Sequence, residues 1–189
     1  MTRFRLQFPP RLIPALAERY TAAGSPKAQA AERVLVETVG PAIREAGSIQ
    51  KGQFLALCRW KSPRVLRRAM ENGADLVEEA TAVAFAARHE ALRIGNLMIL
   101  RGVSWPVASV LLHYGHPDRY PILDVRALES LGVKQPAQYT FEFWWAYVQA
   151  CRQLADKHGV DMRTLDRALW RWSKEQREGT RRRRAPQAG

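Results

Sequence analysis

Cysteine is scarce in this chain of 189 residues, and its scarcity excludes several classes of protein. Only Cys58 and Cys151 are present, far apart in the sequence and without a CxxC spacing. Two cysteines supply neither a disulfide framework nor the thiolates of an iron–sulfur cluster. We therefore expect a reduced protein that holds no iron–sulfur cluster, no metal and no other cofactor.

Long apolar runs are also missing. No stretch approaches the roughly 18 uninterrupted apolar residues that a membrane-spanning helix needs. The first twenty residues contain three prolines and several arginines, which is unlike the apolar core of an export signal. We expect neither export nor membrane insertion, and a cytoplasmic, nucleoid-associated location.

Lysine is rare as well, although the chain is strongly basic. The net charge is +12, and 24 of the 30 cationic residues are arginines. Arginine presents a planar, forked set of donors that suits phosphate groups, so the composition favours an anionic polymer such as double-stranded DNA. Free use of arginine in GC-rich genomes is the alternative explanation. The RRRR run at 181–184 accounts for only four of these charges.

Alternating strand patterns are almost absent, and apolar residues instead recur at helical spacing of three and four. Ser25, Ser48, Thr140 and Asp161 stand where helix N-caps are expected, and Pro41 should break or kink a helix. The pattern predicts an all-α protein of nine or ten helices. We expect one domain of two lobes over residues 1–178, and a basic tail over 179–189 that is disordered in isolation.

A glycine-centred turn joins two helical segments at RGVSWPVASVLL, residues 101–112. Such a hairpin leaves backbone N–H groups unpaired, and the second helix adds the positive end of its dipole. Pro106 lies near the start of that helix, where its missing N–H costs little. The segment therefore suits a phosphate, although many helix–turn–helix corners without such a role also use glycine.

The continuation of this stretch is more specific. The pattern LxGVxxxxAS, followed after about a dozen residues by YPILDVRALESLG, resembles the helix-hairpin-helix DNA glycosylase superfamily, closest to its adenine-glycosylase branch. Residues 96–132 are matched, and the likeness depends on Leu100, Gly102, Val103, Ala108, Pro121 and Asp124. The resemblance implies a helix-hairpin-helix motif beside a central cleft in which DNA lies.

Asp124 takes the catalytic position by this resemblance. Breaking a glycosidic bond builds positive charge on the deoxyribose, and a nearby carboxylate stabilises that charge or deprotonates a water. Aspartate is also a preferred N-cap, worth roughly 1 kcal/mol, and Asp124 directly precedes a helical segment. Capping is thus the alternative to catalysis, and the two roles are compatible.

The chain departs from the family at two hairpin positions. Ser104 replaces the usual second glycine, which requires a backbone conformation open to other residues. Pro106 stands where lyase-active members carry a Schiff-base lysine, so an imine at that site is excluded. The resemblance therefore implies a monofunctional enzyme that uses water as the nucleophile. An alkylated purine is the favoured substrate, because a cationic base leaves easily and suits an aromatic pocket.

The residues that we expect to contact DNA come from the hairpin, from the basic segment RWKSPRVLRR and from the region around Asp124. A solvated basic surface is the alternative for the basic segment. The expected contacts are Arg101, Gly102, Val103, Ser104, Trp105, Lys61, Arg64, Arg67, Arg68, His116 and Arg126.

Three tryptophans are candidates for a pocket that receives an extruded base, because an aromatic face recovers part of the cost of unstacking it. They are Trp60, Trp105 and Trp144, and for each a place in the core is the alternative. The four histidines show no metal-ligand spacing.

Two other functions remain open for this sequence. The first is a non-catalytic DNA-binding protein on the same scaffold, in which Asp124 serves only as a helix cap. The second is a helical adaptor whose basic surface meets an acidic protein. In each case we expect a monomer.

Overall fold

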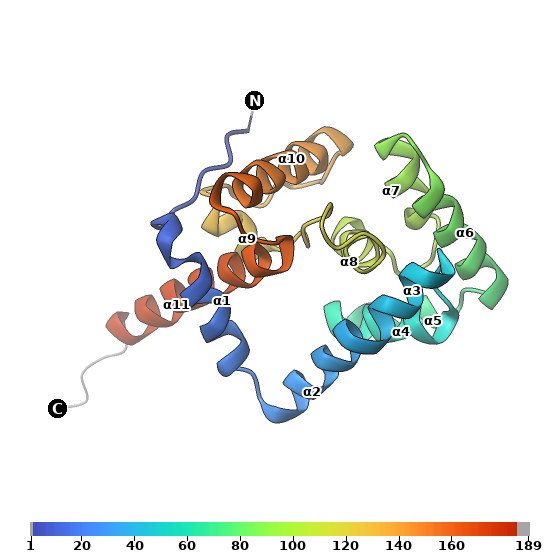
Figure 1. The fold of residues 1–189 in the computed structure, drawn as a ribbon, viewed down its shortest axis with the longest axis horizontal. Helices are drawn as coiled ribbons and strands as arrows, with labels where there is room; N and C mark the ends of the chain where they lie inside the picture. The colour runs from blue at the N-terminus through green and yellow to red at the C-terminus, as the bar shows by residue number, and fades with distance from the viewer. Residues whose placement is uncertain (1, 185–189) are drawn as a thin grey trace.

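The computed structural model describes residues 2–184, and every regular element within them is a helix (Figure 1). The all-α class predicted from the sequence is confirmed. Three short elements are η1 (Pro10–Leu12), η2 (Leu35–Val39) and η3 (Pro63–Val65). The α-helices are α1 (Ile13–Ala22), α2 (Pro26–Val34), α3 (Gly40–Ala46), α4 (Lys51–Lys61), α5 (Leu66–Met70), α6 (Ala74–Ala86), α7 (Glu90–Met98), α8 (Trp105–Gly115), α9 (Val125–Ser130), α10 (Phe141–His158) and α11 (Met162–Arg184).

Three of the four N-caps named from the sequence, Ser25, Thr140 and Asp161, begin helices in the structure. Ser25 accepts a hydrogen bond from the N–H of Ala28, and Thr140 caps α10 in the same way. The carboxylate of Asp161 accepts from the N–H of Thr164 at 2.8 Å. Ser48 was expected to cap the next helix but is buried two residues earlier. A capping box formed by the side chains of Gln50 and Gln53 begins α4 instead.

Pro41 distorts the chain between α2 and α3, as predicted. The residues before it form the π-helical turn η2, in which the N–H of Gly40 bonds to the carbonyl of Leu35. A proline cannot donate to the preceding turn, so the hydrogen-bond pattern shifts by one residue there. The path from α2 to α3 therefore continues through a widened turn rather than ending.

The helices gather in two groups around one core (Figure 1). Helices α1, α9, α10 and α11 lie on one side, and α3 to α8 lie on the other. Helix α11 packs against α1 and α9, and α8 packs against α3, α4 and α7. A single cluster of buried apolar side chains connects the groups, and it extends in sequence from Phe8 to Leu169.

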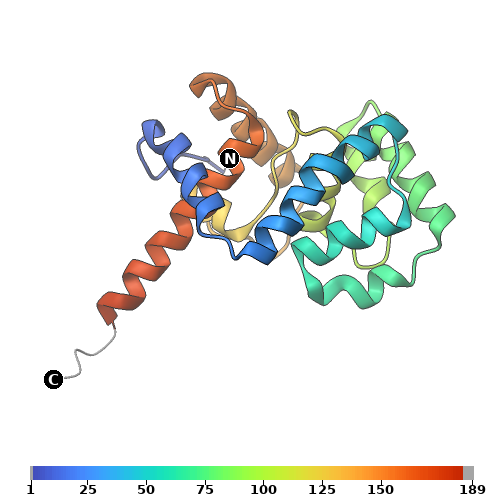
Figure 2. The same cartoon turned by 60° about the horizontal axis from the view of Figure 1, so that its bottom comes forward.

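Helix α11 is longer than the sequence analysis expected. It continues to Arg184, and Figure 2 shows its last turns projecting away from the other helices. Residues 179–184, where the sequence predicted the start of the basic tail, continue this helix, and residues 185–189 lie outside the described part. No helix between residues 2 and 184 is both long and apolar enough to cross a membrane.

Candidate functional site

The segment that leads into Asp124 is held by side chains from two helices of the opposite groups. The N–H of Leu123 donates to the Ser109 hydroxyl of α8 at 2.8 Å. The N–H of Ile122 donates to both carboxylate oxygens of Asp166, on α11, at 3.1 Å. An extended segment without strand partners needs such side chains to satisfy its buried backbone groups.

Two further side chains fix the carbonyl groups of the same segment. The Tyr147 hydroxyl of α10 donates to the carbonyl of Ile122 at 2.9 Å. The ring nitrogen Nδ1 of His113, on α8, lies 2.8 Å from the carbonyl oxygen of Tyr120. Burial lowers the pKa of His113 to about 3, so the ring is neutral at pH 7 and donates from Nδ1. Contacts from α8, α10 and α11 thus set the position of Asp124.

The Asp124 carboxylate makes two hydrogen bonds. Its Oδ1 accepts from the N–H of Arg126 at 2.9 Å, which caps α9 as the sequence predicted. Its Oδ2 lies 2.8 Å from Nζ of Lys61, the last residue of α4. The Asp124 side chain is 27% exposed and that of Lys61 is 10% exposed. This ion pair joins residues 63 positions apart, and Lys61 is therefore not free to meet a phosphate on the surface as expected.

A cavity of about 280 Å³ opens beside this ion pair. Its walls carry three cations, two carboxylates and three aromatic rings. The lining residues are Tyr20, Trp60, Lys61, Ile122, Asp124, Ala127, Arg163, Asp166, Arg167 and Trp170. We call this cavity the Asp124 pocket.

Asp166 lies at the inner wall of the Asp124 pocket. Burial raises the pKa of its carboxyl to about 7, while Arg163 opposes the shift. The nearest atoms of Arg163 and Asp166 are 3.8 Å apart. Asp166 therefore combines a structural bond to Ile122 with a proton affinity suited to neutral pH.

Glu32, on α2, pairs with two arginines of α11 next to the pocket. Its Oε1 lies 2.6 Å from Arg163 and 2.8 Å from Arg167. Its other oxygen accepts from the hydroxyl of Tyr20 at 3.1 Å. Burial pushes the pKa of Glu32 upward, but the two arginines bring it below its usual range. The carboxylate is thus charged and ties α2 to the wall of the pocket.

The aromatic walls come from three helices, and cations lie over each ring. Arg163 lies over Trp60 at 5.3 Å, and Arg126 lies over Trp170 at 5.0 Å. Trp60 was expected at a base pocket and does line this cavity. The expectation for Trp144 is wrong, because its ring is fully buried in the core. Trp105 packs against Trp144 and is not part of the Asp124 pocket.

A second cavity of about 350 Å³ adjoins the first. The two cavities share Tyr20, Arg167 and Trp170 as lining residues. Helix α2 and the turn η2 together supply most of the remaining wall, including Glu32 and Arg33. The two cavities thus adjoin along α1 and α11, with α2 lining one of them and α4 and α9 lining the other.

The turn between α7 and α8 has the backbone that a tight hairpin needs. Gly102 has φ +81°, and an added Cβ would lie 3.0 Å from the backbone N of Ala69 and from the carbonyl oxygen of Val65. Ser104 has φ −121°, in the extended region, so serine is unstrained where the resembling family has glycine. The N–H of Val103 bonds back to Leu100 at 3.1 Å.

The hairpin is fastened to the turn after α5 by a buried amide. Asn72 accepts from the N–H of Arg101 at 2.9 Å and donates to its carbonyl at 3.0 Å. The Arg101 guanidinium is exposed and pairs with Glu71 at 2.7 Å. The first N–H groups of α8 have no partner in their own helix, which leaves that end suited to an anion.

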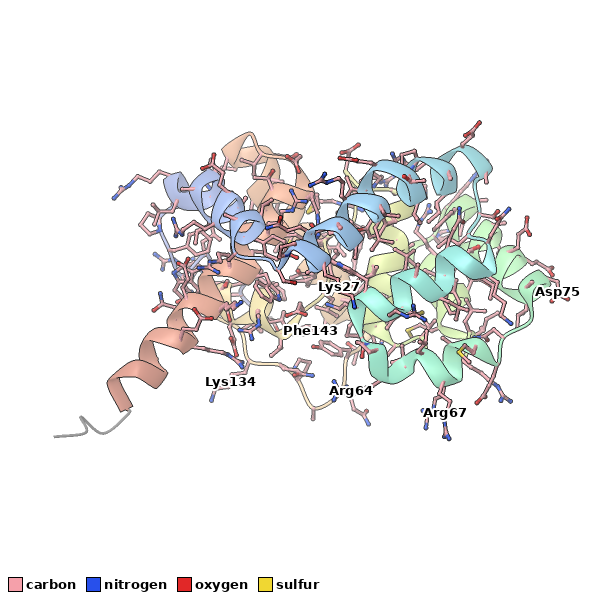
Figure 3. The ribbon with its side chains drawn as sticks, turned by 90° about the horizontal axis from the view of Figure 1, so that it is seen from below. Lys27, Arg64, Arg67, Asp75, Lys134 and Phe143 are labelled. Atoms are coloured by element: carbon pink, nitrogen blue, oxygen red, sulfur yellow. The ribbon has the colours of Figure 1, made fainter. Side chains whose placement is uncertain are left out.

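Basic side chains extend along one edge of the molecule, beside the η3–α5 segment against which this hairpin packs. Figure 3 shows Arg64 of η3 and Arg67 of α5 pointing outward along the same edge as Lys134. These three residues and Arg68 are exposed. The structure thus places most of the predicted basic segment on the surface, and it adds Lys134, which the sequence analysis did not single out.

The other expected DNA contacts lie in different surroundings. His116 is half-buried next to Arg93 and packs edge-on against Phe85. Burial lowers the pKa of His116, and Arg93 adds to the shift. Arg126 lies at the first turn of α9 and covers Trp170. The hairpin, His116 and the Asp124 pocket are thus three separate places, and His116 is not a lining residue of the pocket.

Several pocket residues were not singled out from the sequence, namely Tyr20, Arg163, Asp166 and Trp170. Asp166 and Trp170 belong to the segment DRALWRW, residues 166–172, whose spacing by itself indicates only an amphipathic helix. The available signal was Asp166, a carboxylate within an otherwise apolar stripe of that helix, because a buried aspartate requires partners. In the part of the chain that the structure describes, no three side chains of histidine, cysteine or acidic residues are grouped to hold a metal.

Compared with protein-family models, curated proteins and solved structures, the chain shows no match in any of the three.

Proposed function

We propose that this protein binds double-stranded DNA as a helix-hairpin-helix protein and acts as a DNA glycosylase, with Asp124 as the catalytic carboxylate. The observation that supports the proposal most directly is the position of Asp124. Its carboxylate lies on the wall of a cavity, and contacts from α8, α10 and α11 fix the segment that carries it. Such preorganisation is what charge stabilisation in a transition state requires.

In this mechanism the deoxyribose of an extruded nucleotide lies against Asp124. As the bond to the base breaks, positive charge develops at C1′ and on the ring oxygen. The carboxylate stabilises this charge and accepts a proton from the attacking water, so the base leaves and an abasic sugar remains. The hairpin at Gly102 and the exposed arginines of η3 and α5, against which the hairpin packs, bind phosphates along one surface of the protein.

The charged groups of the Asp124 pocket affect which kind of damaged base is released. Asp124 pairs with Lys61, and the remaining carboxylates also face arginines. Arg163 and Arg126 already lie over the rings of Trp60 and Trp170. A cationic base would compete with these groups for the same partners, so we expect neutral lesions to be released faster than the alkylated purine that the sequence favoured.

The test is single-turnover base release from duplexes that each carry one alkylated, deaminated or oxidised base. Release from at least one duplex, and none from undamaged DNA, supports the glycosylase and identifies its substrate class. Binding of every duplex without release favours the second candidate, a non-catalytic DNA-binding protein. The double hydrogen bonding of Asp124, as cap of α9 and partner of Lys61, is the observation that favours this candidate.

A further inference from the structure

Helix α2 is held to the rest of the molecule by polar contacts. Every residue of α2 is at least partly exposed, so the helix gains little from apolar burial. The Gln29 amide donates to two carbonyl groups, at the end of α1 and in the turn after it, both at 2.9 Å. The link to a distant part of the chain is Glu32, whose carboxylate pairs with two arginines of α11. Helix α2 is therefore free to leave α11 when another anion takes the place of this carboxylate.

The hydrogen bonds to Glu32 are distributed unevenly over its two oxygens. Among the described residues, Oε1 accepts from Arg163 at 2.6 Å and from both Nε and Nη2 of Arg167, at 3.2 Å and 2.8 Å. Oε2 accepts from the Tyr20 hydroxyl at 3.1 Å. The donor fork of an arginine usually meets two different oxygens of an anion, whereas both donors of Arg167 meet the same one here. The donors thus fit an anion with more oxygens better than they fit a carboxylate.

Two buried donors next to this cluster lack an acceptor. Within residues 2–184, Nε of Arg163 and the hydroxyl of Tyr114 are buried without a hydrogen-bond partner. Burial raises the pKa of Tyr114 to about 12, and the charges of Arg163 and Glu32 are near enough to act on the same hydroxyl. A buried donor without an acceptor is costly and calls for an explanation. An anion with additional acceptor oxygens beside Arg163 is such an explanation.

We propose that Arg163, Arg167 and Tyr20 bind a small phosphate monoester, and that the carboxylate of α2 holds this site when the ligand is absent. The site lies where the two cavities meet, because Arg163 lines the Asp124 pocket and Arg167 lines both cavities. The larger cavity, of about 350 Å³, provides space for the group that the phosphate carries. The inference goes beyond the proposed function, because it requires neither DNA nor base release.

The charge of the ligand determines whether it can displace Glu32. A phosphate monoester has three terminal oxygens and carries about two negative charges at neutral pH. A phosphodiester has two terminal oxygens and one negative charge, as a carboxylate does, so it gains little by taking the place of Glu32. The site should therefore select a monoester over the diester phosphates of a DNA backbone. This preference distinguishes it from the hairpin and from the exposed arginines of η3 and α5.

Displacement of Glu32 has a consequence that can be measured on α2. Lys27 and Arg33 are exposed residues of this helix, and Figure 3 labels the first of them. Trypsin cleaves after lysine and arginine once the local helix opens, and the rate of cleavage reports that opening. Binding of the ligand should therefore accelerate cleavage after Lys27 and Arg33, although a bound ligand stabilises the folded state.

The experiment is calorimetric titration of the wild-type protein with inorganic phosphate, the minimal probe of this chemistry, at constant ionic strength. Dimethyl phosphate is the diester control, and the titrations are made at about pH 8, where inorganic phosphate carries nearly two negative charges. We expect saturable binding of phosphate and no binding of dimethyl phosphate at the same concentrations. Trypsin digestion followed by mass spectrometry should show faster cleavage after Lys27 and Arg33 in phosphate, and no change in dimethyl phosphate.

Three variants locate the binding site. Glu32→Gln removes the competing charge, so the affinity for phosphate should rise about tenfold or more. Arg167→Gln added to Glu32→Gln removes the donor fork together with its former partner, so no unpaired carboxylate remains, and binding should be lost. Glu37→Gln removes a carboxylate from the wall of the larger cavity and should keep the wild-type affinity. Thermal unfolding without ligand establishes that each variant is folded.

Four outcomes overturn the inference. They are no binding of phosphate by the wild-type protein, equal binding of dimethyl phosphate, unchanged affinity in Glu32→Gln, and undiminished binding by the double variant, which would place the ion on other arginines. If Glu32→Gln does not fold, the wild-type titrations and the trypsin pattern still decide, because unchanged cleavage of α2 in phosphate contradicts displacement of Glu32. Base release is not part of any of these assays, so their outcome and that of the glycosylase test are independent.

Discussion

Nζ of Lys61 and Oδ2 of Asp124 are 2.8 Å apart, although 63 residues separate them in the chain. The pair brings the end of α4 to the start of α9 and forms one wall of the Asp124 pocket. The carboxylate therefore has three tasks in our account, because it caps α9, pairs with an amine and faces the cavity. The predictions below separate these tasks.

The capping task of Asp124 is separable by the choice of substitution. Asparagine retains a side-chain oxygen that accepts from the N–H of Arg126, whereas alanine retains none. Asp124→Ala should therefore lower the free energy of unfolding by about 1 kcal/mol more than Asp124→Asn does. Denaturant unfolding of the two variants measures the difference, and equal stabilities would show that the cap contributes nothing.

Gly102 should be far less tolerant of a side chain than a helical glycine is. Its φ of +81° is unfavourable for alanine, and the new Cβ would lie 3.0 Å from backbone atoms of Val65 and Ala69. Gly102→Ala should cost about 1–3 kcal/mol of unfolding free energy and weaken duplex binding by displacing the hairpin.

Gly95 provides the control for that substitution. It lies within α7, and a Cβ added there meets nothing within 4 Å. Gly95→Ala should raise the unfolding free energy by roughly 0.5–1 kcal/mol, because glycine is a poor helix former. Thermal unfolding of both variants measures the two changes in stability. A Gly102→Ala variant as stable as the wild type would contradict the described turn.

Asp166 should make part of the stability depend on pH. Its pKa is about 7 in the fold, whereas an exposed aspartate has a pKa of 3.8. Between these values the folded state binds more protons than the unfolded state, so this contribution to stability is present at low pH and is lost as the pH rises to about 7. Asp166→Asn removes the titrating group and keeps an acceptor for Ile122.

The comparison with Asp166→Asn isolates this effect. His113 contributes with the opposite sign, because its pKa is lowered to about 3, and it is unchanged in both proteins. The variant should therefore gain stability relative to the wild type between pH 4 and pH 7, by at most about 1.4 kcal/mol per pH unit. Urea unfolding across this range is the measurement, and parallel pH profiles would contradict the raised pKa.

The exposed arginines of η3 and α5 should bind DNA through electrostatic contacts with its phosphates. Removing Arg64 or Arg67 should reduce the slope of log affinity against log salt by about one for each, and weaken binding to all duplex sequences alike. Arg11→Ala removes an exposed charge from η1, among the other group of helices, and should leave the slope unchanged. Fluorescence anisotropy at several salt concentrations tests this, and equal slopes for all three variants would exclude the basic edge as the DNA contact.

Local signals were predictable from the sequence, and contacts between distant segments were not. The caps at Ser25, Thr140 and Asp124 depend on residues within three positions, so their chemistry is visible in the sequence. Ser48 failed as a cap because the two glutamines that follow it form a competing capping box. The cavity residue Asp166 requires knowledge of where α11 packs, which no local pattern supplies.

The length of α11 has a similar explanation. Its charged residues suggested disorder after 178, but Arg171 pairs with Glu175, and Lys174 with Glu178, one turn apart. Such pairs support a helix in water, and arginine is a good helix former. Gly179 is a possible helix end in the sequence, but it has no positive φ in the structure and the helix continues through it, and no proline follows until Pro186.

Single-turnover base release by Asp124→Asn, compared with the wild type on the duplex that the wild type processes best, tests the central claim most directly. Asparagine retains the oxygen that caps α9 and nearly the shape of aspartate, but it lacks the negative charge. Both proteins should therefore bind the duplex equally. We predict that release is lost in the variant. Equal release by the two proteins would contradict the assignment of Asp124 as the catalytic carboxylate.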